Sequence, residues 1–534
     1  MPDQPPGTGP WSWDLPEPPR PAARAVSSPR TFRRAVLFTI AGTALPGLGL
    51  IAARRRVVGG VVLAAFALTL LSLGVYALVD WQGLLARFVN PTTLYRLSVA
   101  LIALALVWVG VVVASHLSLR GPANRAQRVA GGLLVGVLAF AVAAPMAVAA
   151  RYSYDSASAV NGVFKSESTS KSATRPTFGG KPSKGATAQQ DPWADKPRLN
   201  ILLLGGDAGK GREGTRTDTV ILASIDTRTG DTTLFSLPRN TGRMPFPKDS
   251  PLRRSYPDGF TNGNGDDPEF FLNAMYGNLP ANVPKDVLGA TDDLGADALK
   301  LSVGAALGLS VDYYVLINLQ GFSKMVDALG GITVNINSYI PIGGNTDLGI
   351  PPKDFLRPGP NQKLDGRDAL WYARGRFGSD DFARMDRQRC VINAIIKQAN
   401  PANMLARYED VAKAGKQIVQ TDMPQEVLPL MVDLSMRVKD GNVRSIVFRH
   451  NEDGFRSPRP DFNRMRQRVR VALGEAAADP GPGATPKSPT AKSPSGGSSS
   501  PKAAPKKRAP ESENVDDTCA YNPEMAATAT PYRG

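Results

Sequence analysis

Residues 199–237 contain three short apolar runs separated by turn-forming residues: LNILLLGGDAGKGREGTRTDTVILASIDTRTGDTTLFSL. Runs of this length, rich in Leu, Ile and Val, predict buried β-strands, which we place at 199–206, 219–226 and 232–237. Further elements are predicted downstream: strands at 312–319, 332–336 and 443–448, and helices at 267–277, 292–308, 322–331, 365–373, 380–399, 401–415 and 424–438. The alternation predicts an α/β domain over 198–474, with a mixed central sheet flanked by helices.

The chain before this domain is strongly apolar, in four stretches at 35–53, 57–79, 97–118 and 129–150. The last three are long enough to cross a hydrocarbon core, which needs about 20 residues. The first contains GTALPGLG at 42–49, and its Gly and Pro residues favour a re-entrant or interfacial hairpin. We therefore expect an α-helical transmembrane anchor at 35–150, with about three spans plus this hairpin.

Arginines in the short loops predict how the anchor is oriented. Arg54–Arg56 lie between the first two stretches, and Arg120, Arg125 and Arg128 lie between the last two. The positive-inside rule makes both loops cytoplasmic, so the chain after residue 151 is expected outside the cytoplasmic membrane. Three segments of biased composition complete the organisation: a disordered cytoplasmic arm at 1–34, a flexible stalk at 151–197 and a low-complexity tail at 475–534.

Composition narrows the chemistry. The net charge of the 534 residues is +16, which suits nucleic acid, anionic lipid or a phosphorylated substrate. No nucleic-acid recognition motif is present, so we expect no nucleic-acid partner. Two cysteines are too few for a disulfide-built scaffold or a four-thiolate zinc site. The two histidines, His116 and His450, argue against histidine-based catalysis or a histidine metal cluster.

The loop after the first strand, GGDAGKGREGTRTDT, does not have the spacing of a phosphate-binding P-loop, because Gly211 follows Lys210. It does supply Asp207 at the end of one strand, and Arg216 and Asp218 at the start of the next. Neighbouring strands can bring both carboxylates to one rim, which suits Mg²⁺. The alternative is ordinary turn chemistry, since Asp beside Gly favours turns.

Arginines are concentrated after the third strand and again near residue 380. Arg239 follows the third strand directly, and Arg374 and Arg376 are expected on one side of an extended segment. On the following helix, polar and charged residues recur every three or four positions: Asp381, Arg384 and Arg387 or Gln388. Clustered arginines suit bidentate capture of phosphate oxygens. The alternative is a salt-bridge ladder on a solvated helix face.

Four segments of the chain, at 200–209, 216–241, 312–336 and 364–389, resemble in order and spacing the blocks of the LytR-CpsA-Psr family of bacterial cell-wall proteins. They read NILLLGGDAG, RTDTVILASIDTRTGDTTLFSLPRNT, DYYVLINLQGFSKMVDALGGITVNI and LDGRDALWYARGRFGSDDFARMDRQR. The resemblance covers about 199–450. It implies a phosphotransferase that moves a glycopolymer from a polyprenyl-pyrophosphate carrier to a peptidoglycan sugar hydroxyl. Mg²⁺, or Mn²⁺ in its place, would assist, beside an apolar lipid pocket.

The resemblance also implies roles for individual residues. The family's metal carboxylates fall on Asp207 and Asp218. Its catalytic and phosphate-binding positions fall on Arg216, Arg239, Arg374, Arg376 and Arg384, with Asp381 and Gln388 completing the helix; Arg387 lies between matched positions and is a further substrate-binding candidate. Asn240 departs from the pattern, because the family has Asp there, so a charged role at this position is excluded. The candidates for general base are Asp381 and the metal-ligand carboxylates.

Several alternatives stay open at this point. Water in place of a sugar acceptor would make the protein a polyprenyl-pyrophosphate hydrolase. Binding without turnover would make it a receptor or regulator of the cell envelope or of transcription. Helices 292–308 and 424–438 are candidates to line the lipid pocket with the sheet. Cys390 and Cys519, both expected outside the membrane, either form a disulfide that ties the tail back near the site or remain free thiols.

Overall fold

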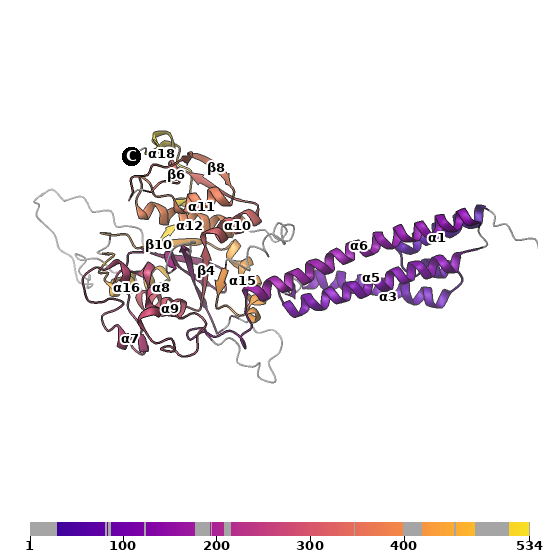
Figure 1. The fold of residues 1–534 in the computed structure, drawn as a ribbon, viewed down its shortest axis with the longest axis horizontal. Coiled ribbons are helices and arrows are strands. Elements are labelled where there is room, and N and C mark those ends of the chain that lie inside the picture. Colours follow the sequence, from indigo (N-terminus) through magenta and orange to yellow (C-terminus); the bar gives the residue numbers. More distant parts are fainter. Residues whose placement is uncertain are drawn as a thin grey trace, which may run out of the picture. The chain divides into compact units, whose positions relative to one another are not determined.

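The computed structural model describes residues 29–80, 83, 87–121, 124–176, 193, 195–207, 215–345, 348–398, 419–452, 455–475 and 512–532. The chain divides into two compact units, one formed by residues 1–79 with 99–150 and the other by residues 80–98 with 151–534 (Figure 1). The helix predicted at 401–415, the arm at 1–28 and most of the tail at 475–534 lie outside the described residues.

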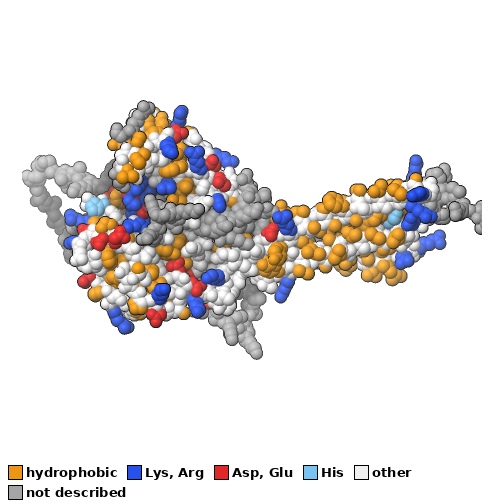
Figure 2. Space-filling model, viewed as in Figure 1, with side chains coloured by type: hydrophobic (Ala, Val, Ile, Leu, Met, Phe, Trp, Pro, Cys, Tyr) orange, Lys and Arg blue, Asp and Glu red, His pale blue; other side chains and the backbone are white. Residues whose placement is uncertain are grey.

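The first unit is helical. Its helices are α1 (Pro29–Ala44), α2 (Leu48–Ala52), α3 (Arg56–Val79) and parts of α5 (Pro91–Leu119) and α6 (Arg125–Val163). By length and composition, α3, α5 and α6 are able to cross a membrane, as predicted. Apolar side chains cover the visible face of these helices (Figure 2). The first apolar stretch forms two helices, because the chain turns at Gly47, where φ is +100°.

The second unit is built on a mixed seven-stranded sheet, which confirms the predicted fold class. The strand order is β11-β10-β3-β2-β1-β4-β9, with β1–β4 and β3–β10 parallel and the other pairs antiparallel. The strands are β1 (Arg198–Asp207), β2 (Arg216–Asp226), β3 (Thr232–Leu237), β4 (Tyr313–Asn318), β9 (Val419–Thr421), β10 (Val443–Val447) and β11 (Glu513–Asn514). All six residues of β3 are buried, as expected for a strand covered on both faces.

Helices cover both faces of this sheet. Successive side chains of a strand point to opposite faces, so neighbouring residues of β1 pack against the elements on different faces of the sheet. Leu202 and Leu204 share a core cluster with α8 (Leu272–Asn282), α9 (Leu294–Leu307) and α16 (Phe462–Ala472). Leu203 packs instead in a cluster with Ile392 and Ile396 of α12 (Asp381–Gln398). The functional helix α12 therefore lies on the face opposite α8 and α9.

Two small sheets pack with α10 (Leu319–Leu329), α11 (Gly366–Arg374) and α12 in a separate apolar cluster. They pair β5 (Ile332–Ile336) with β8 (Gly359–Leu364) and β6 (Ile340–Ile342) with β7 (Asp354–Leu356). Of these strands the sequence predicted β5 alone, because β8 reads GPNQKL and has no apolar run. The remaining elements are α7 (Pro251–Ser255), η1 (Pro268–Phe270), η2 (Gln425–Val427), α15 (Leu428–Asp440), α17 (Val515–Thr518) and α18 (Pro523–Thr528).

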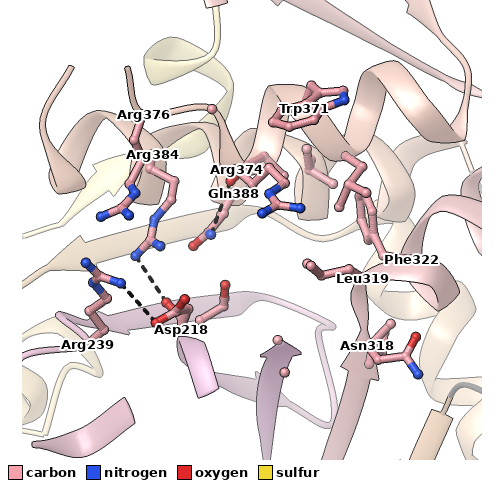
Figure 3. Close-up of a pocket in the computed structure, with 18 of the residues that line it drawn as sticks. Asp218, Arg239, Asn318, Leu319, Phe322, Trp371, Arg374, Arg376, Arg384 and Gln388 are labelled. Atoms are coloured by element: carbon pink, nitrogen blue, oxygen red, sulfur yellow. Dashed lines mark hydrogen bonds and ion pairs between the residues drawn. The ribbon is translucent and has the colours of Figure 1, made fainter. Parts of the chain in front are cut away.

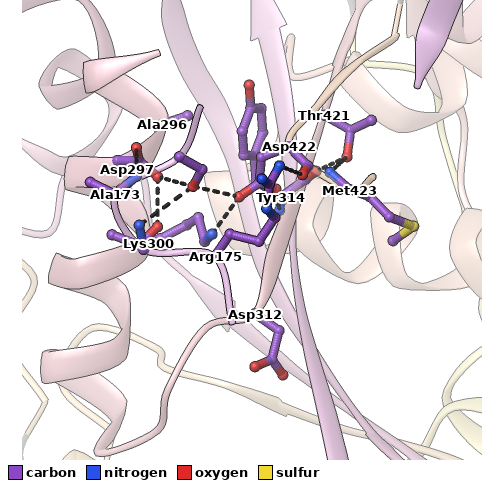
Figure 4. Close-up of polar contacts among 12 residues, drawn as sticks. Ala173, Arg175, Ala296, Asp297, Lys300, Asp312, Tyr314, Thr421, Asp422 and Met423 are labelled. Atoms are coloured by element: carbon purple, nitrogen blue, oxygen red, sulfur yellow. Dashed lines mark hydrogen bonds and ion pairs between the residues drawn. The ribbon is translucent and has the colours of Figure 1, made fainter. Parts of the chain in front are cut away.

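The flexible stalk expected at 151–197 is wrong for its first half. Helix α6 continues to Val163, and the segment after it is hydrogen-bonded to the domain (Figure 4). The carboxylate of Asp297, which is 1% exposed, accepts hydrogen bonds from the Ser172 hydroxyl at 2.8 Å, the Thr174 hydroxyl at 2.6 Å and the Ala173 amide at 2.9 Å. Polar composition predicted flexibility, whereas here the polar groups satisfy a buried charge.

The low-complexity tail expected at 475–534 is likewise wrong for residues 512–532. Strand β11 adds to the edge of the main sheet beside β10, and Val515 is fully buried. A disulfide joins Cys519 to Cys390 of α12, with a Cα–Cα distance of 5.6 Å. The second unit therefore extends beyond the predicted limits of 198–474 on both sides.

Candidate functional site

A cavity of about 650 Å³ lies between the main sheet and the layer formed by α10, α11 and α12. Charged residues line one side of it, and apolar residues line the other (Figure 3). The charged lining contains five arginines against two aspartates: Arg216, Arg239, Arg374, Arg376, Arg384, Asp218 and Asp381. The excess of positive charge suits an anion that carries several negative charges.

Asp218 occupies a bulge near the start of β2. The β1–β2 register shifts between Gly205, which faces Thr219, and Gly206, which faces Thr217, so Asp218 is the extra residue on its strand. Its Oδ1 accepts hydrogen bonds from Arg239 at 3.1 Å and from Asn273 at 3.3 Å. Burial alone would raise the pKa of this carboxyl, but the charges of Arg239 and Arg384 and the hydrogen bonds lower it. Asp218 is therefore ionised at neutral pH.

Arg384 is the most deeply buried arginine of the cavity, with 4% of its surface exposed. It donates a hydrogen bond to the backbone carbonyl of Asp218 at 3.1 Å and pairs with the Asp381 carboxylate at 3.0 Å. Burial lowers the pKa of its guanidinium, and Asp381 and Asp218 oppose that shift. Its buried Nε has no hydrogen-bond partner among the described residues. Such an orphaned donor is costly unless a ligand completes it.

The carboxylate of Asp381, the first residue of α12, lies close to three guanidinium groups. Its Oδ1 lies 3.0 Å from Arg384, 3.6 Å from Arg239 and 3.9 Å from Arg376. These arginines come from α12, from the loop after β3 and from the loop between α11 and α12. Asp381 thus gathers side chains that are far apart in the sequence into one cationic group, without neutralising it.

The other predicted arginines lie around this group. Arg216 pairs with Glu269 outside the cavity lining, so its charge is partly balanced. Arg374 is the last residue of α11, not part of an extended segment as predicted, and its guanidinium lies 5.0 Å from the Trp371 ring centre. Gln388 lines the cavity and donates to the Ala373 carbonyl at 3.3 Å. All three remain at the cavity wall.

Arg387, a further substrate-binding candidate in the sequence, is hydrogen-bonded to the end of a neighbouring helix in the structure. Its Nε donates to the Tyr372 carbonyl at 2.7 Å, and its Nη2 donates to the Gly375 carbonyl. It does not line the cavity. These carbonyls are left without helical partners where α11 ends, so Arg387 caps that helix from α12.

The backbones of Asp207 and Asp218, the two residues expected to hold metal, lie close together on neighbouring strands. Asp207 faces Arg216 across the antiparallel pair, two residues from Asp218. Within the described residues, no group of three or more His, Cys, Asp or Glu side chains lies close enough to hold a metal ion. The ionised carboxylate of Asp218, which lines the cavity, is a kind of ligand that Mg²⁺ prefers, so this residue fits such an ion.

The apolar side of the cavity is lined by the main sheet and by α10, α11 and α12. Its side chains are Leu203, Val315, Ile317, Leu319, Phe322, Met325, Leu370, Trp371, Val391, Ile392 and Ile395. Helices 292–308 and 424–438, which we expected to line it, do not: α9 packs on the opposite face and α15 packs near the start of β1. The periodicity of those helices predicted burial but not the partner.

Asn273 and Asn318 are among the polar residues lining the cavity that sequence reasoning missed. Asn273, which binds Asp218, is the second residue of α8, and Asn318 ends β4 and caps α10. Neither belongs to a charged cluster. A polar residue near the end of the predicted strand at 312–319 was the available signal for Asn318, whereas Asn273 had no such signal.

Comparison with known proteins gives a consistent result. A model of the LytR_cpsA_psr family matches residues 160–454. The polyisoprenyl-teichoic acid--peptidoglycan teichoic acid transferase TagU of Oceanobacillus iheyensis is 30% identical over 250 residues, which are 45% of this chain and 63% of that protein. Biofilm regulatory protein A of Streptococcus mutans is 27% identical over 266 residues, covering 48% and 58%.

This chain thus spans less than two thirds of the length of these relatives. Among solved structures, Bacillus subtilis TagT has a TM-score of 0.35 at 20% identity, with 57% of this chain and 99% of that chain covered. Protein gbs0355 of Streptococcus agalactiae has a TM-score of 0.39 at 24% identity, with 53% and 90% covered.

Proposed function

The chain belongs to the LytR_cpsA_psr family, and on that premise we propose that it transfers a glycopolymer from a polyprenyl-pyrophosphate carrier to a peptidoglycan hydroxyl. The name of the Oceanobacillus iheyensis relative, a polyisoprenyl-teichoic acid--peptidoglycan teichoic acid transferase, supports this reaction class. The polymer transferred in this proposal is a glycan that is attached to its carrier through phosphate.

The two-sided cavity is the observation that carries this proposal. A lipid-linked pyrophosphate has an anionic group joined to a long hydrocarbon chain. The charged side offers five arginines, one of which, Arg384, has a buried Nε without a hydrogen-bond partner among the described residues. The apolar side offers a wall that includes Phe322 and Ile395. Guanidinium groups bind phosphate oxygens in bidentate fashion, and burial of hydrocarbon gains about 25 cal/mol per Å².

The residues perform the reaction by positioning and charge neutralisation, which dominate phosphoryl transfer. Arg384 and Arg239, fixed by Asp381 and Asp218, hold the pyrophosphate oxygens in one orientation. Arg374 and Arg376 cover the oxygens from the α11 side. When bound, Mg²⁺ would neutralise further negative charge, with Asp207 and Asp218 as its protein ligands.

In the transfer step, the acceptor hydroxyl oxygen forms a bond to the phosphorus that bears the glycan. The bond from that phosphorus to the bridging oxygen breaks, and polyprenyl phosphate leaves with the electron pair. The hydroxyl proton goes to a carboxylate, and Asp218 and Asp381 are the carboxylates among the described cavity residues. The arginines stabilise the charge that develops on the leaving phosphate.

The membrane anchor is proposed to hold this site outside the cytoplasmic membrane. Helices α3, α5 and α6 supply three apolar spans, and the arginine-rich loops precede α3 and join α5 to α6. Basic loops remain in the cytoplasm, so the end of α6 emerges on the other side. The lipid carrier would then reach the cavity from the outer leaflet.

The test uses the full chain in detergent with a polyprenyl-pyrophosphate-linked oligosaccharide and peptidoglycan fragments. Products are followed by mass spectrometry in Mg²⁺, in Mn²⁺ and in EDTA. We expect glycan joined to peptidoglycan and release of polyprenyl phosphate, only with metal. Release of lipid phosphate without a joined product would instead establish a hydrolase. Binding without turnover would support a regulator, a role that the name of the Streptococcus mutans relative suggests.

A further inference from the structure

The C-terminal residues 512–532, which we call the strap, pack along the side of α12 that faces away from the cavity. Arg389 of α12 pairs with Glu513 at 3.4 Å, and Asn393 donates to Asp516 at 2.8 Å. Lys397 also pairs with Asp516. Positions 389, 393 and 397 are four residues apart and therefore share one helix face.

The opposite face of α12 carries the proposed phosphate site. Asp381, Arg384 and Gln388 line the cavity, and Val391, Ile392 and Ile395 continue the lining. The helix thus separates the strap from the substrate. The disulfide from Cys390 to Cys519 fixes the strap to α12 covalently, six residues after Arg384.

The middle of the strap is also held by the segment around β5. Asn335 donates to the Cys519 carbonyl at 3.0 Å, and Asn337 donates to the Ala520 carbonyl at 2.9 Å. The Asn522 amide donates back to the Asn337 side chain at 2.9 Å. The course of the strap from residue 513 to residue 522 is therefore fixed by contacts on two elements.

The end of the strap reaches the loop that carries Arg376. The Tyr532 ring lies 5.6 Å from the Phe377 ring, centre to centre. Gly378 has a φ of +72°, and a Cβ built on it would lie 2.4 Å from the Tyr532 ring. The tyrosine therefore lies directly on the glycine, in a space that no other residue type would leave open.

This contact is placed to act on the site. Phe377 follows Arg376 directly, is 9% exposed and lines the cavity. The ion pair between Arg376 and Asp381 is a long one, because the guanidinium lies 3.9 Å from the carboxylate. The loop between α11 and α12 makes a turn of its own, in which the Ser379 amide donates to the Arg376 carbonyl at 2.8 Å. Tyr532 adds packing from outside that turn.

We propose that the strap positions the arginine loop of the phosphate site, with Tyr532 acting through Phe377 and Gly378 on Arg376. This inference rests on the proposed function for its consequence, the binding of pyrophosphate, but not for the contact itself. Tyr532 is a positioning residue and touches no substrate. The aromatic ring of Tyr532, and not its hydroxyl, makes the packing contacts with Phe377 and Gly378.

The first experiment measures amide hydrogen exchange of residues 375–380 in the full chain in detergent. Tyr532→Ala is compared with Met525→Ala, a truncation of an exposed side chain on the same strap. We expect exchange of this loop to rise severalfold in Tyr532→Ala, because the aromatic contact with Phe377 is lost. Exchange should be unchanged in Met525→Ala and restored in Tyr532→Phe. Equal exchange in Tyr532→Ala and wild type would overturn the proposal.

The second experiment measures binding of inorganic pyrophosphate to the same variants by calorimetry. We expect affinity to fall about two- to tenfold in Tyr532→Ala and to return in Tyr532→Phe, with the melting temperature of all variants close to that of wild type. Unchanged affinity beside raised exchange would overturn the link to Arg376. If wild type binds no pyrophosphate, the proposed function is contradicted, while the exchange experiment still decides the strap.

Discussion

The guanidinium of Arg384 donates a hydrogen bond to the backbone carbonyl of Asp218 at 3.1 Å, across a sequence separation of 166 residues. One residue belongs to α12 and the other to β2, so this bond joins the cationic helix to the rim of the sheet. The proposed phosphate site lies where these two elements meet.

Removing Arg384 is expected to abolish most turnover while leaving the fold intact. We predict that Arg384→Ala lowers kcat by about 10²–10³, because a preorganised donor to the developing charge is lost. Arg384→Lys should recover part of this, since lysine keeps the charge but not the fork of donors. The control is Arg459→Ala, which removes an exposed arginine paired with Asp266. Equal rates for Arg384→Ala and wild type would exclude Arg384 from the mechanism.

Asp218 is expected to make stability depend on acid pH. The pKa of its carboxyl is lowered in the folded protein, with burial opposing the shift and the charges of Arg239 and Arg384 driving it. The ionised form therefore contributes stability that is complete above the ordinary value of 3.8 and lost as pH falls through the lowered pKa. As the pH falls from about 4 towards about 2, the melting temperature of Asp218→Asn should fall less than that of wild type. Parallel curves would contradict this assignment.

Filling the apolar side of the cavity is expected to separate lipid binding from phosphate binding. Ile395 lines that side on α12. We predict that Ile395→Trp raises KM for a donor with a long polyprenyl chain by about tenfold, because the hydrocarbon loses buried surface. Affinity for inorganic pyrophosphate should stay unchanged, and Ile395→Val should keep the KM of wild type. A pyrophosphate affinity that falls in parallel would mean that the substitution disturbs α12 instead.

The disulfide is expected to stabilise the folded unit. Cys390 and Cys519 are 129 residues apart, and in the chain-entropy model a loop of about that length contributes about 4–5 kcal/mol as an upper figure. We predict a lower melting temperature and faster amide exchange over 512–532 when both cysteines are replaced by serine. Intact mass after alkylation, with and without reduction, measures the pairing directly. Two alkylated cysteines in the unreduced protein would show that the bond does not form.

Much of the fold follows from local sequence. The strands β1, β2, β3, β4, β5 and β10 and the helices α9 to α12 lie where apolar runs and periodicity predicted them, because each carries its own burial signal. The three long apolar helices can also be predicted from local sequence, since hydropathy over a single helix is enough to identify them. The order of motifs also indicated which arginines and aspartates to examine.

The sequence offered the disulfide from Cys390 to Cys519 as one of two alternatives, and the structure shows it. The other contacts of the strap and of the segment after α6 could not be predicted, because their polar residues are satisfied by partners far away in the chain. Ser172 and Thr174 read as a flexible linker until Asp297 is placed beside them. Glu513 and Asp516 read as tail residues until α12 presents Arg389 and Lys397. The composition of a segment shows how much apolar surface it can bury, but it does not show which polar partners a distant segment supplies.

The sequence by itself determined the three long apolar helices, the alternating strands and helices, and the set of charged residues that line the cavity. Tertiary structure decided which of them act together. Arg384 and Arg387 lie three positions apart on α12, yet one faces Asp218 and the other caps α11. The physical reason is that each guanidinium is directed by the carbonyls that surrounding elements present, and those carbonyls come together only when α11, α12 and β2 have packed.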